Sequence, residues 1–215
     1  MSYPILYSFK RCPYAMRARM ALLLAEIKCE IREIRLSNKP EHMLEVSPKG
    51  TVPILILEDK VIDESYDIVN WIIEESNIFN DNLVSEQIDL TESLIRKFDD
   101  EFKHHLDRYK YATRYENTNS EFHRAECLKI LIDLEAITSK GKWIFGENLN
   151  KLDISILPFI RQFRIANPEW FDSLEEIGKI KKTLNNYLDS EEFKKIMFKY
   201  DEWQFGSEPV YFPSM

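Results

Sequence analysis

The sequence is short of the residues that build flexible or cross-linked chains. Its 215 residues include 5 glycines, 9 prolines and 3 cysteines. So few glycines and prolines exclude long low-complexity linkers and collagen-like repeats. A small, odd number of cysteines argues against a disulfide framework and favours a reducing compartment.

Positive charge and long apolar runs are also scarce. Lysine and arginine total 29 against 37 aspartates and glutamates, which gives a formal net charge of -8. An acidic surface repels phosphate backbones, so we expect no nucleic-acid partner. The longest apolar runs, such as residues 20–25, are too short to span a bilayer, and the start of the chain lacks the pattern of a secretory signal. We therefore expect a cytoplasmic protein without a membrane partner.

The sequence also lacks the spacing of a metal site. No two cysteines are close enough in sequence for a zinc knuckle, and the 4 histidines show no helpful spacing. The pair His104-His105 is most simply interpreted as solvated side chains on a helix. The sequence predicts no bound metal.

The hydrophobic pattern changes once along the chain. The first part alternates strand and helix patterns in the order β-α-β-α-β-β-α, with strands expected in 3–9, 29–35, 53–57 and 61–62. From about residue 85 the apolar residues recur at helical spacing throughout. We therefore predict an α/β domain over residues 1–76 and an all-helical domain over residues 85–215. The polar segment 77–84 lacks periodicity and is the expected linker.

One cysteine lies where a helix is expected to begin. Proline is favoured at the first helical position, so the pair Cys12-Pro13 places Cys12 at the cap of the first helix. The helix dipole and the absence of acids from residue 10 to residue 20 favour a thiolate. That stretch carries four cations, which are expected to surround Cys12: Lys10, Arg11, Arg17 and Arg19. Cysteines in such surroundings have pKa values lowered from about 8.5 to about 3.5–7.5. A thiolate at neutral pH is a nucleophile and a partner in disulfide exchange.

Other interpretations of the cysteines stay open. The alternative is that Cys12 is a small buried hydrophobic residue, but its charged neighbours argue against burial. Cys29 in a strand and Cys127 on an apolar helix stripe are expected to be inert. Alanine at position 15 removes the second thiol of a Cys-x-x-Cys pair, so a redox cycle through Cys12 needs an external thiol.

Three further motifs have both a structural and a functional interpretation. Gly50-Thr51-Val52-Pro53 is an ordinary turn into a strand, or a cis-proline turn that exposes the preceding backbone. Asp63-Glu64-Ser65 precedes a helix that Ser65 can cap, or it holds the carboxylate and the ammonium of an α-amino acid. Asn150-Lys151-Leu152-Asp153 resembles a capping box and is interpreted as structural.

In this order, these motifs resemble those of the cytosolic glutathione transferase family over nearly the whole chain. The resemblance implies the glutathione transferase fold, a thioredoxin-like domain followed by a helical domain. Cys12 stands where omega-class and glutaredoxin-like members carry a cysteine, and Asn38-Lys39-Pro40-Glu41 is also similar to an omega-class stretch. One departure is asparagine, rather than serine or threonine, at the cap of the Asp153 box.

The resemblance also implies a set of glutathione contacts. Lys39 would contact glutathione, the backbone of Val52 would pair with its cysteinyl part beside a cis Pro53, and Glu64 and Ser65 would hold its γ-glutamyl head. The expected function is glutathione-dependent thiol transfer through Cys12, as in deglutathionylation or dehydroascorbate reduction. Expected partners are glutathione as co-substrate, a small or protein thiol or disulfide, and a second copy of the chain. The alternatives are conjugation of glutathione to electrophiles and a non-enzymatic scaffold.

Overall fold

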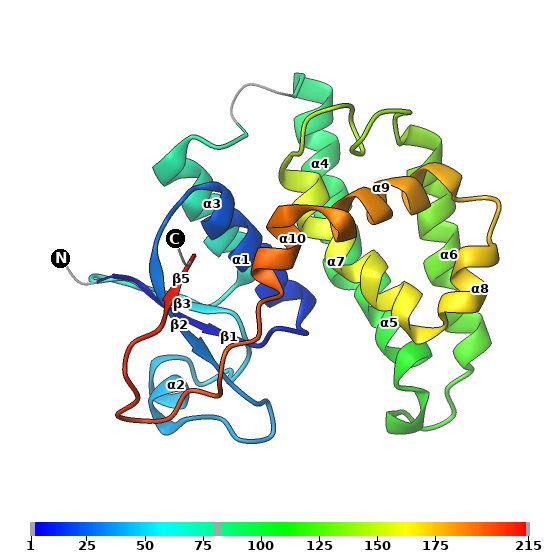
Figure 1. The fold of residues 1–215 in the computed structure, drawn as a ribbon. Helices are drawn as coiled ribbons and strands as arrows, with labels where there is room; N and C mark the ends of the chain where they lie inside the picture. Colours follow the sequence, from blue (N-terminus) through cyan, green and yellow to red (C-terminus); the bar gives the residue numbers. More distant parts are fainter. Residues whose placement is uncertain (1–2, 80–82, 214–215) are drawn as a thin grey trace. The chain divides into compact units, whose positions relative to one another are not determined.

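The computed structural model describes residues 3–79 and 83–213, and its chain divides into two compact units (Figure 1). Unit 1 comprises residues 1–80 and 190–215, and unit 2 comprises residues 81–189. Part of the predicted linker, residues 80–82, lies outside the described residues.

Unit 1 contains the predicted β-α-β-α-β-β-α series, which is confirmed. The elements are β1 (Ile5–Ser8), α1 (Pro13–Leu24), β2 (Cys29–Glu33), α2 (Glu41–Val46), β3 (Ile54–Ile56), β4 (Val61–Ile62) and α3 (Ser65–Ser76). β1 pairs in parallel with β2 across the crossover helix α1, whereas β3 pairs with both β1 and β4 in antiparallel orientation.

The alternation of side chains along β1 assigns the two faces of this sheet. Leu6 lies in register with Ile31 and Leu55, so these three buried residues share one face. Tyr7 and Ile54 lie on the other face, where Met43 of α2 packs against them. In Figure 1 α1 and α3 lie beside each other on the opposite side of the sheet from α2. The sheet is therefore covered on both faces.

The end of the chain differs from the predicted domain division, because residues 190–215 pack in unit 1 instead of with the helical domain. After α10 (Glu191–Ile196), the chain returns to the sheet as β5 (Tyr211–Phe212), which completes the order β4-β3-β1-β2-β5. Phe212 lies opposite Cys29 in the antiparallel β2–β5 pair and is 1% exposed. Burial of this aromatic ring and the backbone pairing of β2's free edge explain the return.

Unit 2 is helical over its described residues. Its helices are α4 (Ser85–Lys97), a π-helical turn (Phe98–Phe102), α5 (Lys103–Lys110), a short 3₁₀ turn (Ala112–Arg114), α6 (Ser120–Ile137), α7 (Lys151–Ala166), α8 (Pro168–Ser173) and α9 (Gly178–Asp189). Residues of the predicted helical stripes are buried at Ile95, Phe98, Phe102 and Leu131, each 0% or 1% exposed, whereas Tyr109 of the first stripe is only half-buried.

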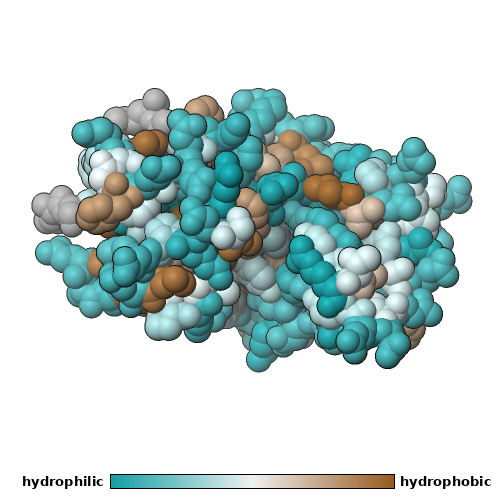
Figure 2. All heavy atoms as spheres, turned by 90° about the horizontal axis from the view of Figure 1, so that it is seen from below, coloured by the Kyte–Doolittle hydropathy of each residue, from teal (hydrophilic) through white to brown (hydrophobic). Residues whose placement is uncertain are grey.

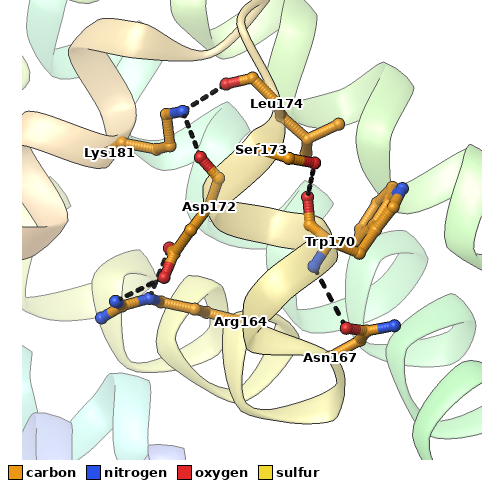
Figure 3. Close-up of polar contacts among 7 residues, drawn as sticks. All are labelled: Arg164, Asn167, Trp170, Asp172, Ser173, Leu174 and Lys181. Carbon is orange, nitrogen blue, oxygen red and sulfur yellow. Dashed lines mark hydrogen bonds and ion pairs between the residues drawn. The ribbon is translucent and has the colours of Figure 1, made fainter.

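Side chains close the helix ends of unit 2. The predicted capping box at α7 is confirmed, since the Asn150 side chain accepts from two backbone N–H groups while the Asp153 carboxylate accepts from the Asn150 N–H at 3.0 Å. Figure 3 shows the corresponding arrangement around α8, where Asn167 accepts from the Trp170 N–H at 3.1 Å. Arg164 and Asp172 form a bidentate ion pair there, with both distances 2.8 Å. The bonds accepted by Asn150, Asp153 and Asn167 satisfy backbone N–H groups that a helix terminus otherwise leaves without a partner.

The surface reflects the high content of charged residues. The face shown in Figure 2 is mostly hydrophilic, with separate smaller hydrophobic patches. Among the described residues, no helix has both the length and the apolar character needed to cross a membrane.

The histidine interpretation is corrected by the structure. His105 is not a solvated side chain, because it is half-buried and its Nδ1 lies 2.7 Å from Nδ1 of His123 on the next helix. Sequence spacing failed here because the loop between α5 and α6 brings together residues that are 18 positions apart.

Candidate functional site

Cys12 lies at the start of α1, as the sequence predicts. Its backbone is extended (φ -76°, ψ 124°), and Pro13 occupies the first helical position. The side chain is half-buried and packs against a cluster that includes Tyr7, Met43 and Val52. The Cys12 Sγ lies 3.6 Å from the carbonyl oxygen of Val52, to which a thiol hydrogen donates. The sulfur therefore has a core-packed position while the residue stays partly open to solvent.

The predicted group of four cations around Cys12 is only partly formed. Arg19 is 0% exposed and pairs with Glu33, and it also donates to Ser8 Oγ at 2.8 Å and to the Ile196 carbonyl at 2.9 Å. The same Glu33 accepts from the backbone N–H of Lys10 at 2.6 Å. The expectation that Arg19 supports the thiolate is thus wrong, since its charge is compensated inside the fold.

The loop before β3 contains the predicted site residues Val52 and Pro53 and packs against a third, Lys39. The Val52–Pro53 peptide bond is cis, as the resemblance implies. Gly50 has φ +59°, and a Cβ on it would lie 3.2 Å from Nζ of Lys39 and 3.1 Å from Leu44. The exposed Lys39 side chain therefore lies across Gly50. Gly50 is two residues before Val52, whose carbonyl oxygen faces Cys12. Glycine suits this position because of both its backbone angle and the close approach.

Asp63 and Glu64, the two acidic residues just before α3, form ion pairs with the ammonium group of Lys49. Lys49 Nζ lies 2.6 Å from a Glu64 carboxylate oxygen and 3.1 Å from an Asp63 carboxylate oxygen. Ser47 donates to the second oxygen of Asp63 at 2.7 Å, and this bond, followed by the Lys49 contact, lowers the pKa of Asp63. The hydrogen bonds that Lys49 donates to Glu64 and to Asp63 raise the pKa of Lys49. The Glu64 side chain is 60% exposed, so its carboxylate is accessible from solvent.

Ser65 is not the cap of α3, in contrast to its structural interpretation. Glu64 occupies the cap position and Ser65 is the first helical residue, because the turn into the helix begins one residue earlier than expected. The Ser65 hydroxyl accepts from the guanidinium of the buried Arg17 at 3.3 Å. A guanidinium can only donate, so the hydroxyl hydrogen of Ser65 is directed to another acceptor.

The two remaining cysteines are buried, as predicted. Cys29 and Cys127 are each 0% exposed. Burial raises the pKa of Cys29 to about 12, and burial likewise raises the pKa of Cys127. Neither thiol ionises near neutral pH. All three cysteines are free.

One loop, residues 47–53, connects the predicted site residues. Its Val52 contacts Cys12, its Gly50 lies against Lys39, and its Lys49 pairs with Glu64. The sequence reasoning missed Lys49 as a partner of Glu64, and it missed the bond from Arg17 to Ser65. The available signal for Arg17 was its position, since Arg17 and Arg19 are the two cations of a largely apolar helix and both lie in the buried stretch 15–22 of α1.

Comparison with known proteins agrees with this fold. The family model for the glutathione S-transferase N-terminal domain matches residues 6–78. A probable glutathione S-transferase, parA, from Nicotiana tabacum is 30% identical over 165 residues, which cover 74% of this chain and 72% of that protein. The chain belongs to the glutathione S-transferase family.

More distant relatives extend over most of the chain. Glutathione S-transferase omega-1 of Rattus norvegicus is 29% identical over 192 residues, covering 81% of this chain and 72% of that protein. A glutathione transferase family member from Pseudomonas fluorescens, solved with two glutathione molecules bound, superposes with a TM-score of 0.78 at 16% identity. That match covers 91% of this chain and 92% of the other. The structural match supports the glutathione transferase fold over both units.

Proposed function

We propose that this protein catalyses glutathione-dependent thiol transfer, with Cys12 as the nucleophile. The observation that carries the proposal is the position of Cys12. It lies at the positive end of α1, and its Sγ is 3.6 Å from the carbonyl oxygen of Val52. A tripeptide that pairs through its cysteinyl backbone with Val52 would bring its own sulfur next to Sγ. Similarity to an omega-1 relative agrees with this assignment.

The reaction needs only one protein thiol. The Cys12 thiolate attacks the glutathione sulfur of a mixed disulfide, a Cys12–glutathione disulfide forms, and the substrate thiolate leaves and takes a proton. A second glutathione thiolate then attacks the sulfur of the bound glutathione, which releases glutathione disulfide and restores the Cys12 thiolate. In the net exchange the substrate sulfur of the mixed disulfide is reduced to a thiol, and the sulfur of the incoming glutathione is oxidised from thiol to disulfide, so the electrons balance.

The surroundings of Cys12 favour a one-thiol cycle over a two-thiol cycle. Ala15, three residues on, is 0% exposed and offers no sulfur. Cys29 is buried in β2 and its raised pKa of about 12 keeps it protonated. A mixed disulfide at Cys12 is therefore resolved by an external thiol.

Three contacts support a site for the two ends of glutathione, two of them at the γ-glutamyl end. Glu64 binds an ammonium group in the form of Lys49 at 2.6 Å, and a ligand's α-amino group has the same charge and donors. The hydrogen of the Ser65 hydroxyl can donate to the ligand's α-carboxylate, because the oxygen already accepts from Arg17. Lys39 adds an exposed ammonium beside Gly50, where it can meet the other carboxylate of the tripeptide.

Conjugation of glutathione to electrophiles is the main alternative within the family. It requires a group that activates the glutathione thiol. Tyr7 packs in the same cluster as Cys12, but burial raises its pKa and its hydroxyl is engaged by His42 at 2.8 Å and by Arg32 at 2.9 Å. These partners argue against Tyr7 as the activating hydroxyl.

The test is turnover by purified protein with three substrates: a glutathionylated small thiol, dehydroascorbate and an aryl halide. We expect turnover of the first two and weak conjugation of the aryl halide. Cys29→Ser and Cys127→Ser serve as matched controls and should retain the activity, since both thiols are buried. Strong aryl-halide conjugation that persists in Cys12→Ala would overturn the proposal in favour of conjugation.

A further inference from the structure

Three of the four histidines converge in unit 2. His104 and His105 lie on α5, and His123 lies on the first turns of α6. Each offers one nitrogen such that the three nitrogens all lie within 4.8 Å of one another. The ring centroids are 5.0 Å apart for His104 and His105, 5.0 Å for His105 and His123, and 5.9 Å for His104 and His123.

We propose that His104, His105 and His123 form a binding site for one divalent transition-metal ion of the zinc, cobalt or nickel type. Neutral imidazole is a preferred ligand of these ions. Nitrogens on a tetrahedral zinc with bonds of about 2.0–2.1 Å lie about 3.3 Å apart. The three nitrogens lie within 4.8 Å of one another, so we expect small side-chain rotations to bring them to that spacing. A fourth coordination position is left for water.

The contact between His105 and His123 suits a metal ion. Their two Nδ1 atoms are 2.7 Å apart, so a single hydrogen lies between them, donated by one ring and accepted by the other. A metal ion between the rings replaces this hydrogen, which moves to the far nitrogen of the donor ring. Glu126, three residues after His123 on α6, interacts electrostatically with both rings and supplies negative charge near the ion.

Arg108 gives the proposed site a distinctive property. Its guanidinium lies 3.0 Å from Nδ1 of His104, and because a guanidinium only donates, that nitrogen is the acceptor. A metal on Nδ1 displaces the guanidinium directly. A metal on the other nitrogen leaves hydrogen on Nδ1, which then repels the guanidinium. Arg108 therefore competes with the metal whichever nitrogen of His104 binds it.

A bound ion would join α5 to α6 across the loop 111–119. The two helices otherwise meet there through aromatic contacts such as that of Phe122 with His105, whose centroids are 6.0 Å apart. Three ligands on two helices fix their mutual register at the end where the connecting loop is exposed. The expected consequence is a thermal unfolding temperature that rises when the metal is added.

The test titrates tag-free, full-length Cys12→Ser protein with cobalt(II), which removes the accessible thiolate as a rival ligand. We expect one cobalt per chain, with visible absorption bands of nitrogen coordination, and displacement by zinc. His105→Gln and His123→Gln should each weaken binding by at least about tenfold, the lower limit for loss of even an indirect partner. The matched control is His42→Gln, which alters the fourth histidine in unit 1 and should bind as before.

Arg108→Met is the second variant, and it makes an opposite prediction. Cobalt should bind several-fold more tightly, because the competing donor and its positive charge are gone. Circular dichroism establishes that each variant is folded. Equal cobalt affinity in His105→Gln, His123→Gln and the parent would overturn the proposal. Unchanged or weaker affinity in Arg108→Met would exclude His104 as a ligand and so overturn the three-histidine site.

Discussion

The first turns of α1 and α7 each have backbone N–H groups without a partner inside the helix, and the two starts compensate for this with different residues. At α7 the cap residue Asn150 is 1% exposed and Asp153 is 0% exposed, and their side chains bind each other's backbone. At α1 the cap residue Cys12 is half-buried, Pro13 removes one N–H that would need a partner, and the sulfur approaches a neighbouring loop. The closed start stabilises its helix, whereas the open start keeps a reactive atom at a positive helix end.

Cys12→Ser tests the open start and should have the largest effect. Thiol transfer should fall by at least about a thousandfold, because a hydroxyl does not exchange with disulfides. The free energy of unfolding should change by less than about 0.5 kcal/mol, since serine is a good cap residue. Steady-state rates and urea denaturation measure the two quantities. A variant that kept its activity, or one that failed to fold, would remove the distinction between the two starts.

Asp153→Ala tests the closed start. The carboxylate accepts from the backbone N–H groups of Ile144 at 2.9 Å and of Asn150 at 3.0 Å, and its loss leaves both buried donors unsatisfied. We expect a loss of about 2–4 kcal/mol in the free energy of unfolding. The control is Asp172→Ala, which breaks the half-exposed pair with Arg164 and should cost less than about 1 kcal/mol. Similar costs for the two variants would contradict a stabilising role for the buried box.

The pH dependence of stability sharpens the same contrast. Burial raises the pKa of Asp153 to about 7, despite its two backbone hydrogen bonds. The folded chain then retains a proton that the unfolded chain loses near pH 4. The stabilisation from this proton is complete below about pH 4 and is lost as the pH rises towards 7. The unfolding free energy of the parent relative to Asp153→Asn should therefore fall between about pH 4 and 7, as measured by denaturation at several pH values. A difference that rose with pH would be the opposite of this result.

The smallest expected effects concern the start of α3, where the residues of the proposed ligand site also begin a helix. Glu64→Gln and Ser65→Ala should each weaken glutathione binding by about 1–3 kcal/mol in calorimetry, the scale of a charge-assisted hydrogen bond. Asp67→Asn removes an exposed charge from the same helical turn and is the matched control. Equal affinity in all three variants would mean that residues 63–65 only begin the helix.

The sequence predicted most of the elements that have a local signal. Proline after Cys12 located the start of α1, and the spacing of Asn150 and Asp153 located the start of α7. Hydrophobic periodicity located the strands and most of the helices, with bounds a few residues too wide. These features depend on residues within one helical turn or one strand.

Features that depend on distant pairing were missed. β5 is two residues long, and its residues Tyr211 and Phe212 pair with Glu30 and Cys29 of β2, far away in the sequence. Arg19 on α1 looked like a site cation, but its partner Glu33 lies at the end of β2. The bond from Arg17 to Ser65 and the meeting of His105 with His123 join different helices. No local pattern reports which charged side chains the fold buries and pairs.

The most direct test of the central claim is the intact mass of the protein after exposure to oxidised glutathione. We expect one added glutathionyl group per chain, mapped to Cys12 by peptide analysis and removed by reduced glutathione. The same adduct should form in the double variant Cys29→Ser and Cys127→Ser, and it should be absent from Cys12→Ser. An unmodified Cys12, or an adduct on Cys29 or Cys127 in its place, would contradict the account.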